Sequence, residues 1–539
     1  MPAKFIPSQL RFTPRLLTVA FAALGMPFAA HAAALDRTTQ PSWGFTEDGT
    51  MAYIEHITVN PDVSGKDSAG RKIPDMTETY RFLNFGVKSD LNDRVSVGVF
   101  YDEPLGADVK YRGDNSFTGV PRNVLGNVYG QASQTLQDNG VNVTIKNATD
   151  LQNTIAGLQS QVRAGQGQLT QAKADIAAAA SQLSQAQTAL VADPSLTTLL
   201  TPKIALLQQG IDAGNQKIQD GQAQLAKGQV AVKTLQGLQT ITAPLESNTE
   251  GTRVSVSSKN LSGVVGVKLG EDKRWQVYGG PVFQKVIGEL HLRGDAYSGA
   301  TGYDASIPTS SEVGWLAGVG YTIPEIALKA ALTYRAKIDH DMPIGENFPL
   351  AKLKGFEAAQ TNKVTVKTPE SVNLDFQTGI NPTTLLMAKV RWEPWSDFVI
   401  RPKLYNAVSG VNLLDYDKDS WLIELGLGKK LSDKLAVSGH VSWDSGAGDP
   451  VTTLGPVNGY WGTSLGAHYA LTPEWSASLG ARYIWLGDAK AKIPNGQQVG
   501  EFKNNHATVY GLRLTYQKNS PPMGVSIRRL LSAPSFWAA

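Results

Sequence analysis

The segment Trp475-Ser-Ala-Ser-Leu-Gly-Ala-Arg-Tyr-Ile-Trp485 decides the fold class of this chain. Its odd-numbered residues are apolar or aromatic, whereas positions 476, 478, 480 and 482 carry serine, glycine and arginine. A period of two is that of a β-strand with one apolar and one polar face. Aromatic residues at both ends of the apolar face suit a strand that crosses a bilayer, because they lie among the lipid headgroups. The segment therefore predicts one strand of a transmembrane β-barrel.

Segments of the same kind recur from Thr77 to Gln517, separated by turns that are alternately short and long. We predict fourteen antiparallel strands, an even number as bacterial barrels require. The fold class is therefore all-β, a fourteen-stranded barrel. The predicted strands cover 51–59, 77–89, 94–112, 252–269, 274–293, 311–323, 327–340, 362–380, 384–404, 418–430, 434–444, 457–471, 474–488 and 505–517.

The turns after the even-numbered strands are short, which places the long loops outside the cell and both chain ends in the periplasm. The segment 384–404 contains Glu393-Pro-Trp-Ser-Asp397 and could form a hairpin, but a hairpin would break the even strand count, so we predict one bent strand. A soluble β-sandwich is the competing fold. It is disfavoured because one face is apolar in nearly every strand while the other carries glycine, serine, asparagine and charge.

Residues 1–32 have the pattern of a secretory signal peptide: basic residues, a short apolar run and the cleavage motif Ala30-His-Ala32. The apolar run is too short for a membrane-spanning helix. The 539 residues include no cysteine, so export through the periplasm needs no disulfide. A net charge of +3 argues against nucleic acid as a partner. We expect a protein of the outer membrane.

The remaining chain divides into a short N-terminal plug, barrel strands one to three, an insertion, strands four to fourteen and a tail. The tail follows a good terminal strand and has no barrel pattern, so we predict disorder there or a frame change in place of a terminal aromatic residue. The predicted ranges are 33–50 for the plug, 51–129 and 251–517 for the barrel, 130–250 for the insertion, and 518–539 for the tail.

The insertion predicts an antiparallel helical hairpin in the second extracellular loop. No aromatic residue occurs between Tyr129 and Trp275, and apolar or small residues from Leu151 to Leu190 recur at alternating spacings of four and three. After a break at Asp193-Pro194, a second helix is expected to start at Thr201-Pro202. Each arm has about 40 residues, or roughly 60 Å at 1.5 Å per residue. The hairpin is either a surface stalk or a docking element for a partner, a lipid droplet or another copy.

Three segments of the barrel resemble a known family. They are Tyr53-Ile-Glu-His-Ile-Thr-Val-Asn-Pro-Asp-Val-Ser-Gly65, Thr333-Tyr-Arg-Ala-Lys-Ile-Asp339 and Pro369-Glu-Ser-Val-Asn-Leu-Asp-Phe-Gln-Thr-Gly379. In this order they are similar to the long-chain fatty acid outer-membrane transporters (FadL-like) and their aromatic-hydrocarbon relatives. The resemblance covers about 33–129 and 250–517. No single motif is diagnostic, and the family's Asn-Pro-Ala plug signature is missing, which bears on gating rather than on the fold.

The resemblance implies uptake of hydrophobic molecules that leave the barrel sideways through a kink in the third strand. The segment Tyr101-Asp-Glu-Pro-Leu-Gly-Ala107 interrupts that strand, since proline lacks the ladder donor and glycine tolerates a bulge. An ordinary bulge at the barrel rim is the alternative. The predicted kink residues are Asp102, Pro104 and Gly106.

An acidic lipid needs a lumen that is apolar for the tail and cationic for the head. The phase of each predicted strand gives the residues that should face the lumen. Each of the cations among them could instead form an inward salt bridge with Glu312, Asp375 or Glu424. The predicted cationic ligand-binding residues are Arg335, Lys337, Lys389, Arg391 and, less securely phased, Lys285, with Arg482 and Arg513 also inward. The predicted apolar residues are Phe82, Phe100 and Leu316, together with Leu422.

Other functions are weaker on the sequence. His440 between Ser438 and Ser442 is what any polar lumen shows, so we predict no enzyme, and the histidines lack metal-ligand spacing, so we predict no metal or cofactor. A general diffusion porin and a surface adhesin that displays the helices remain alternatives. We expect a monomer whose partners are a long-chain fatty acid or another hydrophobic molecule, outer-membrane lipid and lipopolysaccharide, with the ligand's identity open.

Overall fold

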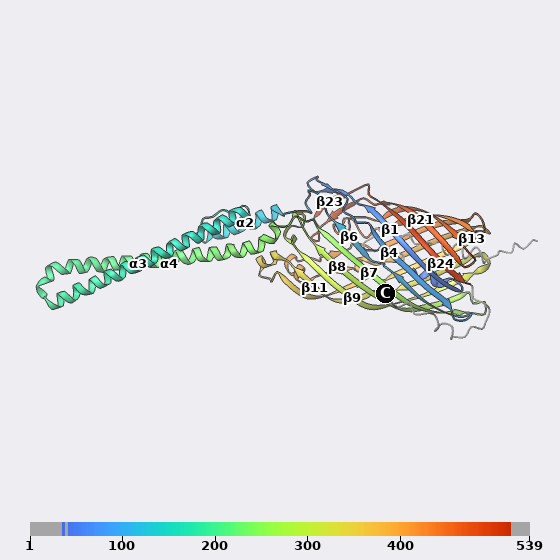
Figure 1. The fold of residues 1–539 in the computed structure, drawn as a ribbon, viewed down its shortest axis with the longest axis horizontal. Coiled ribbons are helices and arrows are strands. Elements are labelled where there is room, and N and C mark those ends of the chain that lie inside the picture. The colour runs from blue at the N-terminus through green and yellow to red at the C-terminus, as the bar shows by residue number, and fades with distance from the viewer. Residues whose placement is uncertain (1–34, 38–40, 519–539) are drawn as a thin grey trace, which may run out of the picture. The chain divides into compact units, whose positions relative to one another are not determined.

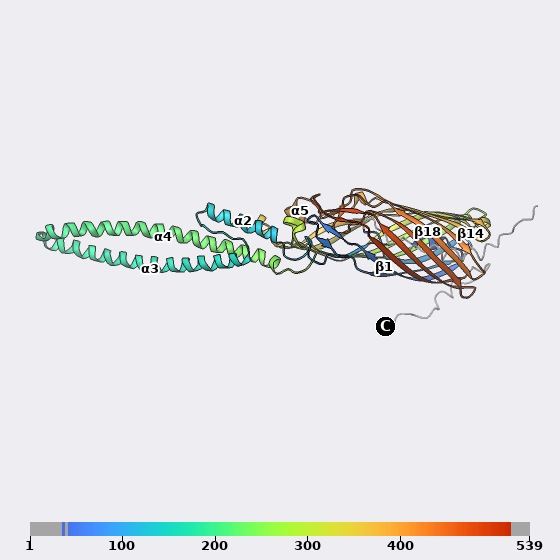
Figure 2. The same cartoon turned by 90° about the horizontal axis from the view of Figure 1, so that it is seen from above.

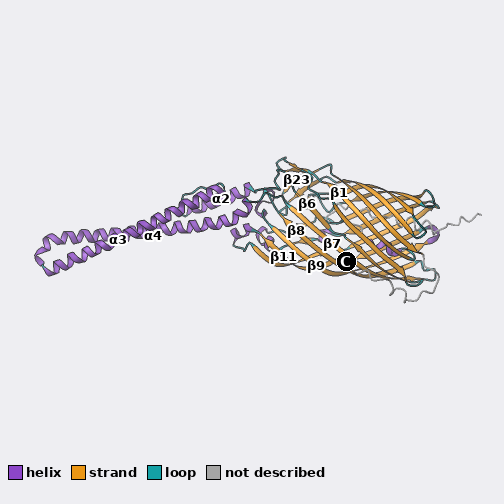
Figure 3. Ribbon diagram, viewed as in Figure 1, coloured by secondary structure: helices purple, strands orange, loops and turns teal. Residues whose placement is uncertain are grey.

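The computed structural model describes residues 35–37 and 41–518. The predicted signal peptide, and the predicted tail beyond Lys518, lie outside this part of the chain. Two units are distinguished: a barrel, which ends at Gly119 and resumes at Glu250, and a helical insertion, Val120–Thr249. Figure 3 separates them by element type, with strands in orange and the long helices in purple.

The barrel wall is one antiparallel sheet of seventeen segments within the described residues. Three wall strands are each broken in two, so the wall has fourteen strands, as predicted. β1 pairs with both β4 and β24, which closes the sheet on itself. Figure 1 shows the strands inclined to the barrel axis. Closure leaves no free edge, which suits a sheet surrounded by lipid.

The fourteen strands, with the broken ones given as pairs, are β1 (Thr50–Asp62), β4 (Tyr80–Asp90), β5 (Val95–Asp102) with β6 (Gly106–Lys110), β7 (Arg253–Leu269), β8 (Trp275–His291), β9 (Asp304–Ile323), β10 (Leu328–Arg335) with β11 (Ile338–Asn347), β12 (Ala359–Thr368) with β13 (Ser371–Asn381), β14 (Thr384–Glu393), β17 (Ser420–Lys430), β18 (Leu435–Asp444), β20 (Tyr460–Ala470), β21 (Trp475–Leu486) and β24 (His506–Lys518).

The outer face of the wall is apolar and carries two bands of aromatic residues. At the end with the short turns, the Trp475 and Tyr516 rings lie 5.2 Å apart between centroids. At the end with the long loops, Trp392 pairs with Trp421 at 6.5 Å. Between the bands the side chains are apolar and exposed, as Leu465 is at 72%. This pattern is that of a barrel in the outer membrane, with aromatic girdles at the two interfaces.

The strand predicted for 384–404 was too long. β14 ends at Glu393, because Pro394 has no backbone N–H to continue the ladder. The residues that follow belong to a long loop with η6 (Trp395–Asp397), a short antiparallel pair of β15 (Val399–Ile400) and β16 (Leu414–Asp415), and α5 (Lys403–Ser409). The strand count survives because this loop contributes no wall strand.

The other long loops are also structured. A five-stranded sheet is built from β2 (Gly65–Asp67), β3 (Lys72–Ile73), β19 (Val451–Thr452), β22 (Ala489–Lys492) and β23 (Gln498–Phe502). The short helices η3 (Asp295–Ala300) and η5 (Pro349–Lys354) lie in loops at the same end, and η4 (Pro324–Ile326) lies in a short turn at the other. Loops tied together by a sheet restrict access to the lumen from this end.

The insertion consists of α2 (Arg122–Asp138), α3 (Ala148–Ala192), the turn η2 (Pro194–Leu196) and α4 (Thr197–Glu246). Figure 2 shows α3 and α4 side by side. The unit starts earlier than the expected residue 130, because α2 precedes the hairpin and Tyr129 donates to Glu246 at 2.8 Å. Burial raises the pKa of Tyr129 to about 12, so this donor stays protonated. α4 begins before the predicted Thr201, and Pro202 lies inside it.

Glycines on α4 allow close approach of the two helices, as the sequence pattern predicts. A Cβ built on Gly214 would lie 2.1 Å from Ile176 Cδ1, and one on Gly228 would lie 3.0 Å from Val162. The large residues of α3 therefore occupy space that side chains on α4 would otherwise fill. Within the described residues, no helix is long and apolar enough to cross a membrane.

Candidate functional site

The third wall strand is broken between β5 and β6, at the segment that the sequence singles out. The ladder between β4 and β5 ends at Phe85 and Tyr101, and apart from the bridge between Thr77 and Val109 it is not continued to β6. Pro104 lies in the break and cannot donate to a ladder. The wall therefore lacks its usual hydrogen bonds between β4 and this part of the third strand.

The N-terminal segment Leu35–Arg37 takes the place of the missing neighbour. Arg37 N donates to Pro104 O at 2.6 Å, and Gly106 N donates to Leu35 O at 2.7 Å. Asp36 and Leu105 thereby form an antiparallel bridge. A Cβ on Gly106 would lie 2.3 Å from the Arg37 guanidinium, so glycine is needed for this close approach. The segment closes the strand edge that the break exposes.

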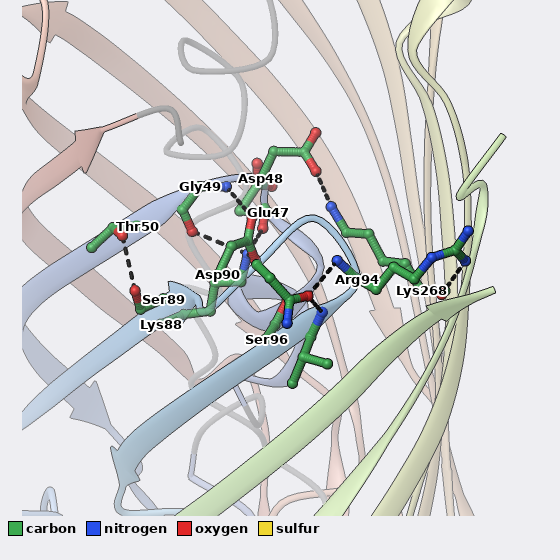
Figure 4. A network of polar contacts seen from close by, with 12 residues as sticks. Glu47, Asp48, Gly49, Thr50, Lys88, Ser89, Asp90, Arg94, Ser96 and Lys268 are labelled. Carbon is green, nitrogen blue, oxygen red and sulfur yellow. Dashed lines mark hydrogen bonds and ion pairs between the residues drawn. The ribbon is translucent and has the colours of Figure 1, made fainter. Parts of the chain in front are cut away.

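A second part of the N-terminal segment is anchored at the short-turn end of the barrel (Figure 4). Lys88 is fully buried and bonds to Asp90 and to the Glu47 and Gly49 carbonyl oxygens. Lys268 pairs with Asp48 at 2.7 Å. These wall cations hold residues 47–49, directly after η1 (Pro41–Thr46), against the barrel wall.

The buried Phe45 ring, next to this anchor, belongs to an apolar cluster inside the barrel. Phe100 and Leu316, two of the predicted apolar lumen residues, are 2% and 3% exposed and lie in the same cluster. Phe82, the third, is buried in a separate cluster with Leu422. The described N-terminal residue Phe45 thus packs inside the barrel against residues of several wall strands, as a plug would.

The predicted cations that do face the lumen are paired with carboxylates. Arg335 lies 3.4 Å from Asp102, and Lys389 lies 3.3 Å from Asp375. Arg391 lies 3.3 Å from Asp36 of the plug and also bonds to Glu393. The other inward pairs are Arg482 with Glu424 and Arg513 with Glu55. Lys389 and Arg482 thus have partners that the salt-bridge alternative names, whereas Arg335, Arg391 and Arg513 pair with other carboxylates.

Two of the predicted lumen cations face outward. Arg335 and Ala336 are both buried, so the alternation inverts at the break between β10 and β11 and Lys337 becomes exposed. On β8 the buried positions are Gln284 and Val286, which turns Lys285 outward. The assignment of an inward face to Lys337 was wrong because one extra residue at a break reverses the phase of a strand. Lys285 was wrong because the phase of its long strand was read one residue out of step.

Sequence reasoning missed several buried charged residues. Lys329 pairs with Glu47 at 2.7 Å and is 2% exposed. Arg37 is 9% exposed, its guanidinium carbon lies 4.7 Å from the Tyr80 ring centre, and Nε has no hydrogen-bond partner. In the described part of the chain, Arg37 forms no ion pair within 4.0 Å. Strand phase could have identified Lys329, but it cannot place a residue of the plug.

An apolar cavity of about 80 Å³ lies on the long-loop side of the break. Leu35 and Leu105 contribute to its lining where the plug meets the third strand, and Phe398 and Leu414 come from the loop after β14. Pockets for drug-sized ligands have roughly 300–1,000 Å³, so this cavity is smaller than such pockets.

The remaining candidate sites offer little chemistry. His440 Nδ1 lies 3.5 Å from Glu424, which also bonds to Arg482. Across residues 35–37 and 41–518, no group of three or more histidine, aspartate or glutamate side chains could hold a metal ion. The described lumen contains charge pairs and an apolar cavity.

Known proteins were compared with the chain by sequence and by structure. No protein-family model matches the sequence. No curated protein sequence matches it either. A FadL homologue from Pseudomonas aeruginosa superposes with a TM-score of 0.55, at 12% identity, over 92% of this chain and 97% of that chain.

Two further structures cover 88% of this chain. The toluene transporter TodX of Pseudomonas putida has a TM-score of 0.47 at 10% identity over 92% of its own length. CymD, a monoaromatic hydrocarbon channel, has a TM-score of 0.42 at 8% identity over 90% of its length. Together with the closed wall of fourteen strands, the likeness to the FadL homologue shows that this chain has the fold of the FadL-like outer-membrane barrels.

Proposed function

We propose that this protein takes up long-chain fatty acids or similar hydrophobic compounds across the outer membrane and releases them sideways through the break in the third strand. The observation that carries the proposal is the exchange of partners at the break: residues 35–37 supply the hydrogen bonds that β4 does not. Side chains also hold this segment, since Asp36 pairs with Arg391 and Arg37 lies over Tyr80. None of these contacts is a ladder hydrogen bond between two wall strands, so the segment can leave without unfolding the wall.

The apolar cavity supports the same route. Leu35 and Leu105 lie both in the cavity lining and at the break. A ligand in the cavity therefore touches the segment whose departure opens the wall. The predicted kink residues lie where lateral release would need them. Pro104 interrupts the ladder, and Gly106 leaves room for the Arg37 side chain. Asp102 forms an ion pair with Arg335.

The acidic headgroup of a fatty acid requires a cation, and Arg37 is the best candidate. Its guanidinium is buried over Tyr80 and forms no ion pair within the described chain. A carboxylate at this position would form a charge-assisted hydrogen bond with the unpartnered Nε. We further propose that the protein acts as a monomer surrounded by outer-membrane lipid and lipopolysaccharide.

Uptake of radiolabelled oleate tests this function. Cells that lack their own transporter are compared with and without the protein, and conductance is recorded in planar bilayers. Uptake with negligible conductance supports the proposal, whereas steady conductance without uptake supports a general porin. The methyl ester of oleate and an alkane of equal length separate headgroup recognition from simple hydrophobicity: loss of discrimination in Arg37→Met supports the assignment of Arg37.

A further inference from the structure

The barrel wall has another break, between β9 and β11. The ladder of β9 with β10 ends at the pair Leu316 and Arg335. β11 pairs with β9 only at residues 304–306. In between, residues 307–314 face residues 337–344 without a ladder. Strands β11 and β12 therefore form a two-stranded flap that joins β9 only near its tip.

The sequence explains why the ladder stops. Arg335 and Ala336 are both buried, which inverts the side-chain alternation between β10 and β11. Pro308 and Thr309 are both exposed, which inverts the alternation within β9. The two inversions lie at opposite ends of the unpaired stretch. In this stretch, a residue of β9 and the residue opposite it on β11 would have to point to different faces of the sheet. A regular ladder does not permit that arrangement.

Side chains hold the flap in place of backbone hydrogen bonds. His340 Nδ1 lies 3.1 Å from Ser310 Oγ, and its Nε2 lies 2.9 Å from Gln284 Oε1. Ile338 covers Gly314, since a Cβ on that glycine would lie 2.5 Å from Ile338 Cγ1. A small set of side-chain contacts can separate at lower cost than a continuous ladder, so this is a weak point of the wall.

The apolar cavity lies directly behind this weak point. Ile307 of β9 and Met342 and Ile344 of β11 line it, opposite Leu35 and Leu105 at the break in the third strand. Met342 and Ile344 are 2% and 0% exposed, so the inner side of the flap is apolar. The cavity thus reaches two breaks in the wall.

The outer rim of the weak point has two different sides. On β9, Val313 and Trp315 are 59% and 51% exposed, and the Trp315 ring lies 5.3 Å from the Tyr334 ring between centroids. On the flap, Lys337, Asp339 and Asp341 are exposed. The unpaired stretch therefore has apolar side chains on β9 and charged side chains on β11. Such a pairing suits an amphipathic molecule at the boundary between the hydrocarbon and the headgroups of a bilayer.

We propose that the stretch between β9 and β11 is a second lateral opening, through which amphipathic molecules dissolved in the outer leaflet reach the apolar cavity. The inference rests on the proposed function and adds a loading route to it. The hydrocarbon tail passes Val313 and Ile307, and the headgroup stays with the charges of the flap. Ligand collected from the membrane then leaves through the break in the third strand.

A reversible crosslink tests the opening. The chain has no cysteine, so Ser310→Cys with His340→Cys creates a single thiol pair whose parent side chains already meet at 3.1 Å. The protein is placed in lipid vesicles with a diazirine derivative of oleate. The ligand is dissolved in the bilayer in one arm and supplied from water on albumin in the other. Mass spectrometry follows photolabelling of the peptide that contains Met342.

A matched pair in the intact wall provides the control. His468 Nδ1 lies 3.0 Å from Ser478 Oγ, and the two residues are direct partners in the ladder of β20 and β21. His468→Cys with Ser478→Cys therefore repeats the chemistry where no opening is proposed. Its oxidation is expected to leave labelling unchanged in both arms.

The proposal predicts that oxidation of the 310–340 pair slows labelling by ligand from the bilayer and leaves labelling from water unchanged, with reduction restoring the rate. An unchanged bilayer rate would overturn the opening, and equal losses in both arms would overturn its lateral character. No labelling in any state would instead contradict the proposed function. If the crosslinked variant does not assemble, His340→Ala removes the side-chain contact and is expected to accelerate labelling from the bilayer; no acceleration counts against the opening.

Discussion

The wall strands β20, β21, β24 and β1 form unbroken ladders, whereas the third, seventh and eighth strands are each broken. In the intact region every residue of β21 from Trp475 to Trp485 pairs with β24, and polar and apolar side chains alternate throughout. In the broken region, Ala336 inverts that alternation and Pro104 interrupts the ladder. The comparison teaches that the apolar cavity lies beside both irregular regions, because Leu105 of the third strand and Met342 and Ile344 of the seventh strand contribute to its lining.

The largest expected effect comes from the buried ion pair at the break. Asp102→Asn leaves Arg335 buried without its carboxylate, which should cost about 3–5 kcal/mol of unfolding free energy. Asp339→Asn is the matched control, because its pair with Lys367 is about half exposed and such pairs contribute roughly 0–1 kcal/mol. Urea unfolding of the folded barrel in vesicles measures both, and equal losses would contradict the importance of the buried pair.

A smaller effect distinguishes the lipid-facing wall from the flap. Leu465 is 72% exposed midway between Trp461 and Tyr469 of β20, so Leu465→Arg should cost about 2–4 kcal/mol in a bilayer. Thr365→Arg on the outer side of the flap should cost roughly 0–1 kcal/mol if that side lies at the headgroups. The same unfolding measurement applies. A large loss for Thr365→Arg would place the flap in the hydrocarbon region.

The smallest effect compares two glycines of the wall. Gly314→Ala places a Cβ 2.5 Å from Ile338, so the flap must shift, at a cost of about 1–3 kcal/mol. Gly439→Ala in the intact wall has its nearest neighbour at 3.6 Å and should be neutral or stabilise by about 0.5–1 kcal/mol. Hydrogen exchange at β11 reads the local change. Similar protection in both variants would show that Ile338 does not hold the flap.

The sequence predicted the regular parts of the molecule well. Alternation and turn length gave the fourteen strands, and the heptad spacing with its glycines gave the helical hairpin. Phe82, Phe100 and Leu316 are buried as strand phase predicts, whereas Lys337 and Lys285 face outward. Lys285 lies on an unbroken strand whose phase was misread by one residue. At Lys337 a break shifts the phase by one residue, and that shift depends on tertiary packing rather than on the local pattern. For the same reason Arg37 could not be placed beside Tyr80.

The most direct test of the account is to lock the plug onto the third strand. Asp36 and Leu105 form a bridge flanked by the hydrogen bonds of their neighbours, the kind of pair whose Cα atoms are about 4.5 Å apart and within disulfide reach. The double variant Asp36→Cys with Leu105→Cys is assayed for oleate uptake in its oxidised and reduced forms. Both forms lack the ion pair of Asp36 with Arg391, so they differ only in the disulfide. The account predicts uptake only in the reduced form. Equal uptake in both forms would contradict lateral release at this break.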